Sequence, residues 1–336
     1  MYKKFNIRFS ILLILLATFF STISIVEAKQ TISTTRNNED VNLVTDSLNT
    51  KTLPKRFRKT SDLTDVDNNN LNLKGLNTLN ISGSQQFSAF NLPLIINSIG
   101  NSKPITIVDL RQESHGFING IPVSWKGAKN NANQGLTMKE VLSDEAAKLA
   151  SIKLGEPITF YNHPDMKVIV ESVQSENQLV NSKSLSYLRV PVTDGKIPTD
   201  EMVDYFVQWV KKQPKDIWLH FHCKEGIGRT TTFMAMYDMM KNSKEVTADD
   251  IIKRQVMLAN FKKDKLDSFT NNERGRFLKS FYEYCKENSD SFDVKWSDWK
   301  KTHGTNNENP NKEIQRFIKH MNTEKTKPHL DALSFS

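Results

Sequence analysis

The sequence predicts an α/β fold in which helices flank a central sheet. Residues 104–111 and 217–221 form two apolar runs with the length and the aliphatic and aromatic content of buried strands. Apolar residues recur at helical spacing in residues 137–153, 198–210 and 229–241, before and after the second run. Strands that alternate with amphipathic helices are typical of this fold class. A chain of 336 residues is long enough for one large domain, or for one domain that carries a smaller one.

The N-terminal segment has the pattern of a secretory signal peptide, which we expect to span residues 1–28. A basic start precedes an apolar core at residues 11–20, and Val26-Glu27-Ala28 has the small-x-small pattern of a cleavage site. The alternative is an uncleaved membrane anchor, although the apolar run is short for a membrane span. We therefore expect the protein to be secreted or held at the exterior of the cell envelope, without a stable membrane association after cleavage.

The rest of the chain divides by composition. Residues 29–50 are polar and predict a flexible leader, and residues 51–302 carry the apolar patterns of a catalytic domain. Short strand patterns separated by polar turns favour an inserted β subdomain at about residues 155–190. Residues 303–336 are rich in Asn and Lys and predict a polar C-terminal tail.

The most informative motif follows the second apolar run. Cys223 is separated by five residues from Arg229, which suits a cysteine thiolate that attacks a phosphate held by backbone N–H groups. Gly226 and Gly228 allow the chain to curl so that these groups point inward, and the helix that follows adds positive potential. Arg229 can bind two phosphoryl oxygens, and the Thr230 hydroxyl can donate to the sulfur. The alternative is a buried structural cysteine in a strand-to-helix turn.

The segment resembles the active-site loop of the protein tyrosine phosphatase superfamily, His-Cys-x5-Arg-Ser/Thr. On this basis Cys223 and Arg229 are the predicted catalytic residues of the loop. The remaining loop positions are predicted to bind the substrate or to support the cysteine: His222, Lys224, Glu225, Gly226, Ile227, Gly228 and Thr230. The second cysteine, Cys285, lies in a helical apolar pattern and is expected to be buried, so two cysteines do not indicate a disulfide scaffold.

A leaving alkoxide needs a general acid. The superfamily supplies it from a loop some thirty residues before the cysteine, where this chain has Asp194 between a predicted strand and a predicted helix. Asp194 is therefore the predicted general acid. The alternatives are that Asp194 only forms a turn, or that Asp200 or Asp204 supplies the proton.

Two further motifs narrow the resemblance. Residues 108–116 and 120–125, together with Thr193-Asp194 and residues 222–231, resemble the bacterial cysteine phytases, which remove phosphates from myo-inositol hexakisphosphate. This resemblance implies a tyrosine-phosphatase-like domain with a small inserted β-barrel, and basic residues around the substrate. Arg58 is the predicted substrate-binding residue among them; Lys126, Lys129 and the lysines at 262–265 are weaker candidates. Two departures from the family are Gly195, where a histidine is common, and a loop after Trp125 that lacks a carboxylate.

The predicted function is hydrolysis of inositol polyphosphates through a phosphocysteine intermediate, without a metal or another cofactor. The formal net charge of +8 suits a small anionic phosphorylated substrate, and basic and aromatic residues do not alternate as in nucleic-acid-binding segments. One alternative is a protein tyrosine or phosphoinositide phosphatase that acts on host or extracellular targets. Another is a phosphate-binding protein without activity.

Overall fold

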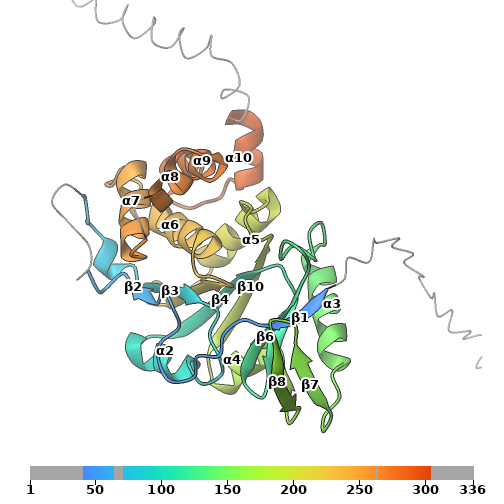
Figure 1. The fold of residues 1–336 in the computed structure, drawn as a ribbon. Coiled ribbons are helices and arrows are strands. Elements are labelled where there is room, and N and C mark those ends of the chain that lie inside the picture. The colour runs from blue at the N-terminus through green and yellow to red at the C-terminus, as the bar shows by residue number, and fades with distance from the viewer. Residues whose placement is uncertain (1–40, 64–70, 101, 262–263, 304–336) are drawn as a thin grey trace, which may run out of the picture. The chain divides into compact units, whose positions relative to one another are not determined.

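Strands and helices pack around a five-stranded sheet in the computed structural model, which describes residues 41–63, 71–100, 102–261 and 264–303 (Figure 1). The predicted signal peptide (residues 1–28) lies outside the described residues. So do most of the predicted leader and all of the predicted tail except its first residue.

The central sheet has the strand order β10-β4-β11-β3-β2. Its strands are β2 (Arg58–Lys59), β3 (Ile81–Gln85), β4 (Ile105–Arg111), β10 (Ser186–Val192) and β11 (Trp218–Cys223). All neighbours pair in parallel except β2, which runs antiparallel to β3. The two predicted buried strands are confirmed as β4 and β11, which lie side by side near the middle of the sheet.

Strand β4 shows why the sheet is covered on both faces. Every residue of β4 is buried. Ile105 and Ile107 belong to one hydrophobic cluster, whereas Val108 and Leu110 belong to another. Because successive side chains in a strand point to opposite faces, one continuous apolar run supplies both layers of the core.

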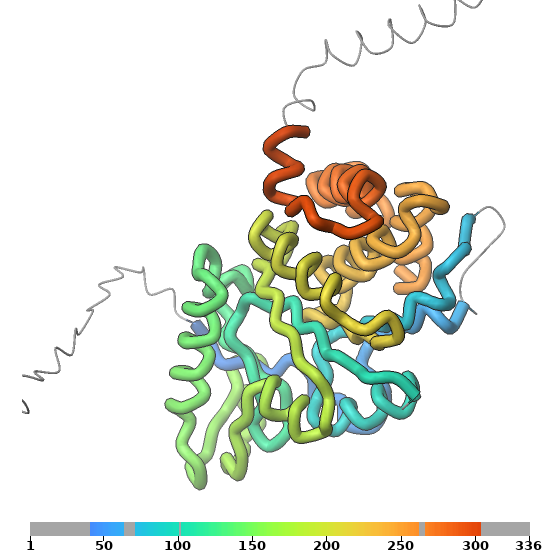
Figure 2. The backbone as a smooth tube through the Cα atoms, turned by 180° about the vertical axis from the view of Figure 1, so that it is seen from behind, coloured from blue at the N-terminus to red at the C-terminus, as the bar shows by residue number. Residues whose placement is uncertain are grey.

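Helices cover both faces (Figures 1 and 2). One layer lies against the larger cluster and comprises α5 (Asp200–Lys211), α6 (Gly228–Asn242), α7 (Ala248–Leu258), α8 (Asp264–Thr270), α9 (Glu273–Asn288) and α10 (Trp296–His303). Helices α2 (Leu92–Ile99) and α4 (Glu176–Ser182) contribute to the cluster on the other face, and a short 3-10 helix, η1 (Leu76–Thr78), precedes β3. Helix α6 starts directly after the loop from β11 and is buried along nearly its whole length, as its sequence predicts.

A smaller sheet has the order β1-β6-β5-β9, and a separate hairpin accompanies it. The sheet contains β1 (Asn42–Thr45), β5 (His115–Ile118), β6 (Ile121–Lys126) and β9 (Val173–Gln174). The hairpin is β7 (Pro157–Phe160) with β8 (His163–Ile169), and α3 (Met138–Ala150) follows β6 in the chain. The Tyr161 N–H donates to the Leu43 carbonyl at 2.9 Å, which ties the hairpin to β1.

These strands correct two predicted boundaries. Residues 155–190 do not form one β subdomain, because α4 lies within them and β10 pairs with β4 in the central sheet. The predicted leader also contains β1, in which Val44 is buried and Leu43 pairs with Trp125. The predicted barrel is not confirmed, since the strands form an open four-stranded sheet and a separate two-stranded hairpin.

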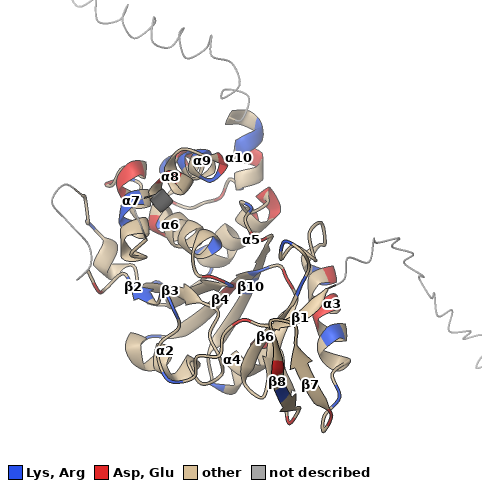
Figure 3. Cartoon of the chain, viewed as in Figure 1, with Lys and Arg blue, Asp and Glu red and all other residues tan. Residues whose placement is uncertain are grey.

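Both signs of charge occur on single helices such as α3 and α10 (Figure 3). Within the part of the chain that the structure describes, no helix is long and apolar enough to cross a membrane.

Candidate active site

The candidate site begins where β11 ends. Cys223 is the last residue of β11, and α6 starts at Gly228, so four residues connect the strand to the helix N-terminus. Gly226 has a φ of 71°, and a Cβ at this position would lie 2.4 Å from the backbone nitrogen of Gln85. Only glycine fits this curl of the loop.

The sulfur of Cys223 is buried and has two hydrogen-bond donors. The Gly226 N–H lies 3.3 Å from Sγ, and the Thr230 hydroxyl lies 3.2 Å from it, as the sequence predicts. These two donors hold the sulfur in place at the start of the loop, close to the N-terminus of α6.

Arg229 is fixed by a buried carboxylate that the sequence did not identify. Its Nη1 and Nη2 lie 2.7 and 3.0 Å from the two oxygens of Glu113, so the pair is bidentate. Burial opposes the charge of Glu113, but Arg229 and Arg111 outweigh it and hold the pKa of Glu113 well below its usual range. Glu113 therefore occupies one edge of the guanidinium. On the other edge, Arg229 Nε has no hydrogen-bond partner among the described residues.

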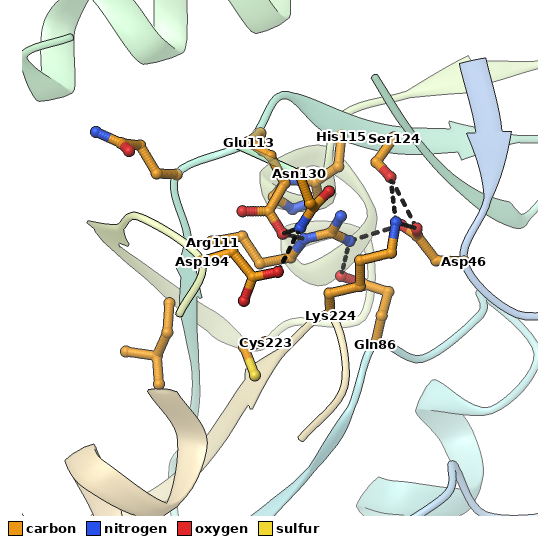
Figure 4. A network of polar contacts seen from close by, with 12 residues as sticks. Asp46, Gln86, Arg111, Glu113, His115, Ser124, Asn130, Asp194, Cys223 and Lys224 are labelled. Atoms are coloured by element: carbon orange, nitrogen blue, oxygen red, sulfur yellow. Dashed lines mark hydrogen bonds and ion pairs between the residues drawn. The ribbon is translucent and has the colours of Figure 1, made fainter. Parts of the chain in front are cut away.

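The carboxyl group of Asp194 contacts the same arginine, Arg229. Its Oδ1 is 3.2 Å from Arg229 Nη2, and its Oδ2 accepts from Asn130 Nδ2 at 2.9 Å (Figure 4). The side chain is 36% exposed, so it is accessible from solvent. The two competing aspartates lie elsewhere, because Asp200 accepts from Trp296 and Asp204 accepts from Ser297, both at α10.

Lys224 connects the loop to the smaller sheet. Its Nζ lies 2.8 Å from Oδ1 of Asp46 and 3.2 Å from the hydroxyl of Ser124 (Figure 4). Asp46 is fully buried and also pairs with Arg111 at 2.7 Å. Next to Lys224, Glu225 is exposed and lies 3.4 Å from Nη1 of Arg56. Lys224 and Glu225 thus lie at the mouth of the loop, and Lys224 is anchored there.

Arg58, a predicted substrate-binding residue, and His222, predicted to bind the substrate or to support the cysteine, both lie behind the loop. Arg58 is buried beneath the loop, where Nη1 donates to the Gly226 carbonyl at 3.0 Å and Nη2 donates to the Thr231 hydroxyl at 2.9 Å. Burial lowers the pKa of Arg58 to about 10. His222 points to the face of β11 opposite to the Cys223 side chain, and its Nε2 lies 2.6 Å from Glu176 Oε1. Both side chains therefore support the loop from within the protein.

His222 belongs to a buried polar cluster behind Cys223. Asp109 Oδ2 accepts from Tyr187 at 2.6 Å and from Arg189 at 2.7 Å, and it lies 3.0 Å from His115 Nε2. Burial would lower the pKa of His115, but Asp109 outweighs it and raises the pKa to about 9.

The same cluster contains the one group of described residues with the spacing of a metal site. Asp109, Glu176 and His222 each offer a ligand atom within 4.8 Å of the others. However, Arg189 and His115 already neutralise these carboxylates. The cluster is therefore suited to bracing the strand ends rather than to binding a cation.

Arg274, at the start of α9, is a cation that the sequence did not single out. Its Nη2 lies 3.1 Å from the place where a Cβ of Gly228 would be, so Gly228 leaves room for it. Its guanidinium packs over the ring of Phe269 at 5.2 Å, and it forms no ion pair among the described residues. The weaker candidates Lys126 and Lys129 are exposed, and the side chains of residues 262–265 are outside the description.

Comparisons with known proteins identify relatives of this chain. Residues 108–241 match the model of the PTP-like phytase family, which is described by its compound, inositol hexakisphosphate. A solved PTP-like myo-inositol phosphatase from Mitsuokella multacida, in complex with myo-inositol-(1,3,4,5)-tetrakisphosphate, is 34% identical with a TM-score of 0.68. The match covers 77% of this chain and 49% of that one. A PTP-like phytase from Bdellovibrio bacteriovorus is 33% identical with a TM-score of 0.64, over 77% of this chain and 94% of that one.

Two curated bacterial proteins are also similar. Effector protein hopD2 of Pseudomonas syringae pv. tomato is 29% identical over 265 residues, which are 73% of this chain and 56% of that protein. The uncharacterized protein AvrBs1.1 of Xanthomonas campestris pv. campestris is 41% identical over 97 residues, which are 26% of this chain and 93% of that protein. The chain thus spans about half the length of the Mitsuokella and Pseudomonas proteins.

Proposed function

Because the chain belongs to the PTP-like phytase family, we propose that it hydrolyses phosphomonoesters of inositol polyphosphates through a phosphocysteine intermediate. One observation carries the proposal: the thiol of Cys223, the guanidinium of Arg229 and the carboxyl of Asp194 converge at one loop. A protein that only bound phosphate would need neither the nucleophile nor the acid.

Arg229 and the loop amides would bind the phosphoryl group. Glu113 holds the Nη1–Nη2 edge of Arg229, which leaves Nε for one phosphoryl oxygen, and Nη2 would bind a second in exchange for its contact with Asp194. These donors stabilise the charge that spreads over the equatorial oxygens in the transition state. They supply the stabilisation that a bound metal ion provides in other phosphatases, and the proposed reaction requires no cofactor.

The two chemical steps follow from the same three residues. The sulfur of Cys223 forms a bond to phosphorus while the bond to the leaving oxygen breaks, and that oxygen takes a proton from Asp194. Asp194 is then a carboxylate, which accepts a proton from the water that attacks the phosphocysteine. Inorganic phosphate forms and the thiolate returns, with Thr230 donating to the departing sulfur. A general acid contributes roughly 10²–10⁴ in rate, so Asp194 matters most for alkoxide leaving groups.

Inositol polyphosphates are the favoured substrates because cations surround the loop. Among the described residues, Arg274 has no ion-pair partner, and Arg56 donates to the Glu225 carbonyl at 2.9 Å and lies 3.4 Å from the exposed Glu225 carboxylate. These two guanidinium groups, with Lys224, are suited to the further phosphates of a highly charged ring. The solved Mitsuokella relative binds an inositol tetrakisphosphate, which supports this choice.

We further infer that the protein is secreted. The support is the signal-peptide pattern in residues 1–28 and the similarity to a Pseudomonas protein that is named an effector. Retention of the N-terminal segment in protein isolated from the growth medium, or failure to find any protein there, would contradict this inference.

The activity is tested by phosphate release from inositol hexakisphosphate under reducing conditions, with the wild type and with Cys223→Ser. We expect release by the wild type and none by the variant. A phosphotyrosine peptide and vesicles with phosphoinositide serve as competing substrates in parallel. Turnover of either in place of the inositol phosphate would move the protein to the alternative class, and equal activity of the variant would refute the phosphocysteine mechanism.

A further inference from the structure

We propose that Asn130 is a positioning residue for proton transfer, which directs the proton of Asp194 to the carboxyl oxygen that faces the phosphoryl group. This inference rests on the proposed function of Asp194 as the general acid. Asn130 is buried, and its Nδ2 donates to Asp194 Oδ2 at 2.9 Å and to Glu113 Oε1 at 3.2 Å. One amide nitrogen thus joins the general acid to the carboxylate that holds the catalytic arginine.

The orientation of the Asn130 amide is determined by Glu113. Glu113 accepts hydrogen bonds from two arginines and stays ionised, so it can only accept from Asn130. The NH2 group of Asn130 must therefore face the two carboxyl groups. Its Oδ1 has no hydrogen-bond partner among the described residues. Both N–H bonds are used, and the amide cannot accept a proton from Asp194.

This arrangement distinguishes the two oxygens of Asp194. Since Oδ2 accepts from Asn130, the proton of the neutral acid resides on Oδ1. Oδ1 is the oxygen that lies 3.2 Å from Arg229 Nη2, on the side where the phosphoryl group would bind. When the phosphorus–oxygen bond breaks, the leaving oxygen takes the proton from Oδ1 and its electron pair forms the new O–H bond. In the second step, Oδ1 accepts a proton from the attacking water.

The loop that carries Asn130 is itself anchored, so the amide is held in place. Asn130 has a φ of 56°, a left-handed conformation that asparagine tolerates better than most residues, and its N–H donates to the Gly127 carbonyl. Asn133 donates to the Gln112 carbonyl and to the Ser114 hydroxyl. The loop is therefore bound to the end of β4, next to Glu113.

The dependence of activity on the leaving group tests the proposal. Loss of a correctly placed acid slows departure of an alkoxide but hardly affects an acidic phenol, which leaves without a proton. The value of kcat/KM reports the steps up to this departure. We would measure it for inositol hexakisphosphate and for 4-nitrophenyl phosphate, with the wild type, Asn130→Ala and Asp194→Asn. Asn131→Ala is the matched control, because the Asn131 side chain bonds Gln134 and not Asp194.

For Asn130→Ala we expect a loss of roughly 10-fold on the inositol phosphate and less than about 3-fold on the aryl phosphate. Asn131→Ala should match the wild type on both. Equal losses on the two substrates would mean that Asn130 is only structural, and no loss on either would also overturn the proposal. The Asp194→Asn variant separates this failure from a failure of the proposed function. If it shows no preference for the aryl substrate, Asp194 is not the general acid.

Discussion

Replacing Glu113 by glutamine tests whether a buried ion pair holds Arg229, the proposed catalytic arginine. The change keeps the shape of the side chain and removes its charge. Glu113 accepts from Arg111 Nε at 2.9 Å and from both terminal nitrogens of Arg229. In Glu113→Gln, one of the two accepting oxygens becomes an NH2 group that faces guanidinium donors, and two buried arginines share one remaining carbonyl.

The expected loss of stability is large because the site is buried and water cannot replace the carboxylate as the acceptor for the two arginines. Breaking a buried pair by removing one partner costs about 3–5 kcal/mol, and the retained carbonyl argues for the lower end, about 3 kcal/mol. With a urea m-value of about 2–3 kcal/mol/M, the midpoint of unfolding should fall by about 1 M at pH 7. Because Arg229 also loses its orientation, kcat/KM should fall roughly 100-fold.

Urea unfolding as a function of pH provides the sharper assay. The pKa of Glu113 is lower in the folded than in the unfolded state. Its stabilising contribution is thus complete above the unfolded pKa, about 4.3, and is lost as the pH falls through the folded value. The difference in the free energy of unfolding between wild type and variant should therefore have its full value at pH 7 and shrink below about pH 4. Glu225→Gln is the control, with a loss of less than about 0.5 kcal/mol, because Glu225 is exposed. A loss of less than about 1 kcal/mol for Glu113→Gln, or a gap independent of pH, would refute the reasoning.

Two further substitutions test the loop and its rim. Gly226→Ala places a Cβ 2.4 Å from the Gln85 backbone nitrogen, at a residue whose φ is in the left-handed region. We therefore expect phosphate release to fall at least roughly 100-fold. Activity near that of the wild type would mean that the loop relaxes to accept the methyl group. Arg274→Ala should raise KM for inositol hexakisphosphate roughly 10-fold with little change in kcat, and the difference should shrink in high salt. Arg276→Ala, on the exposed side of the same helix, is its control, and an equal effect of both changes would point to net charge instead of a contact with substrate.

The local parts of the structure were predictable from the sequence. The buried strands at β4 and β11 are continuous apolar runs, and the cysteine loop places its nucleophile, glycine turn and sulfur donor within eight residues. The boundary of the inserted strands was wrong at β10. Its sequence, Ser186–Val192, has the strand pattern of its neighbours, and only the pairing with β4 assigns it to the central sheet.

The partners of the loop were not predictable, because they come from distant parts of the chain. Glu113 is 116 residues from Arg229, and Asn130 is 64 residues from Asp194. Neither spacing carries a signal in a single sequence. The composition of the segment 109–115, with four charged or titratable residues beside a strand end, was the available indication that buried ion pairs form there.

The positions of Arg58 and His222 behind the loop have a common physical cause. A loop whose amides all point at a ligand turns its carbonyls outward, and these carbonyls need donors when they are buried. Arg58 meets this need at the Gly226 carbonyl, from beneath the loop. His222 alternates with Cys223 along β11, so its ring lies on the other face of the strand, where it contacts the carboxylate of Glu176. Polar residues next to the cysteine in the sequence therefore support the anion-binding loop from behind as well as forming its contact with the substrate.

The N-terminal strand β1 is the last component of that support. Asp46 follows β1 directly and bridges Lys224 of the loop to Arg111 of β4, while Arg111 in turn pairs with Glu113 and so with Arg229. A continuous series of buried ion pairs thus runs from a segment predicted to be a leader to Arg229, the proposed catalytic arginine. Asp46 and Glu113 each lie between two cations, and together with Asp194 they balance the charges of Lys224, Arg111 and Arg229 before the substrate binds. The phosphoryl group can then compete with Asp194, the most exposed of these carboxylates, for Arg229 without displacing the buried Glu113.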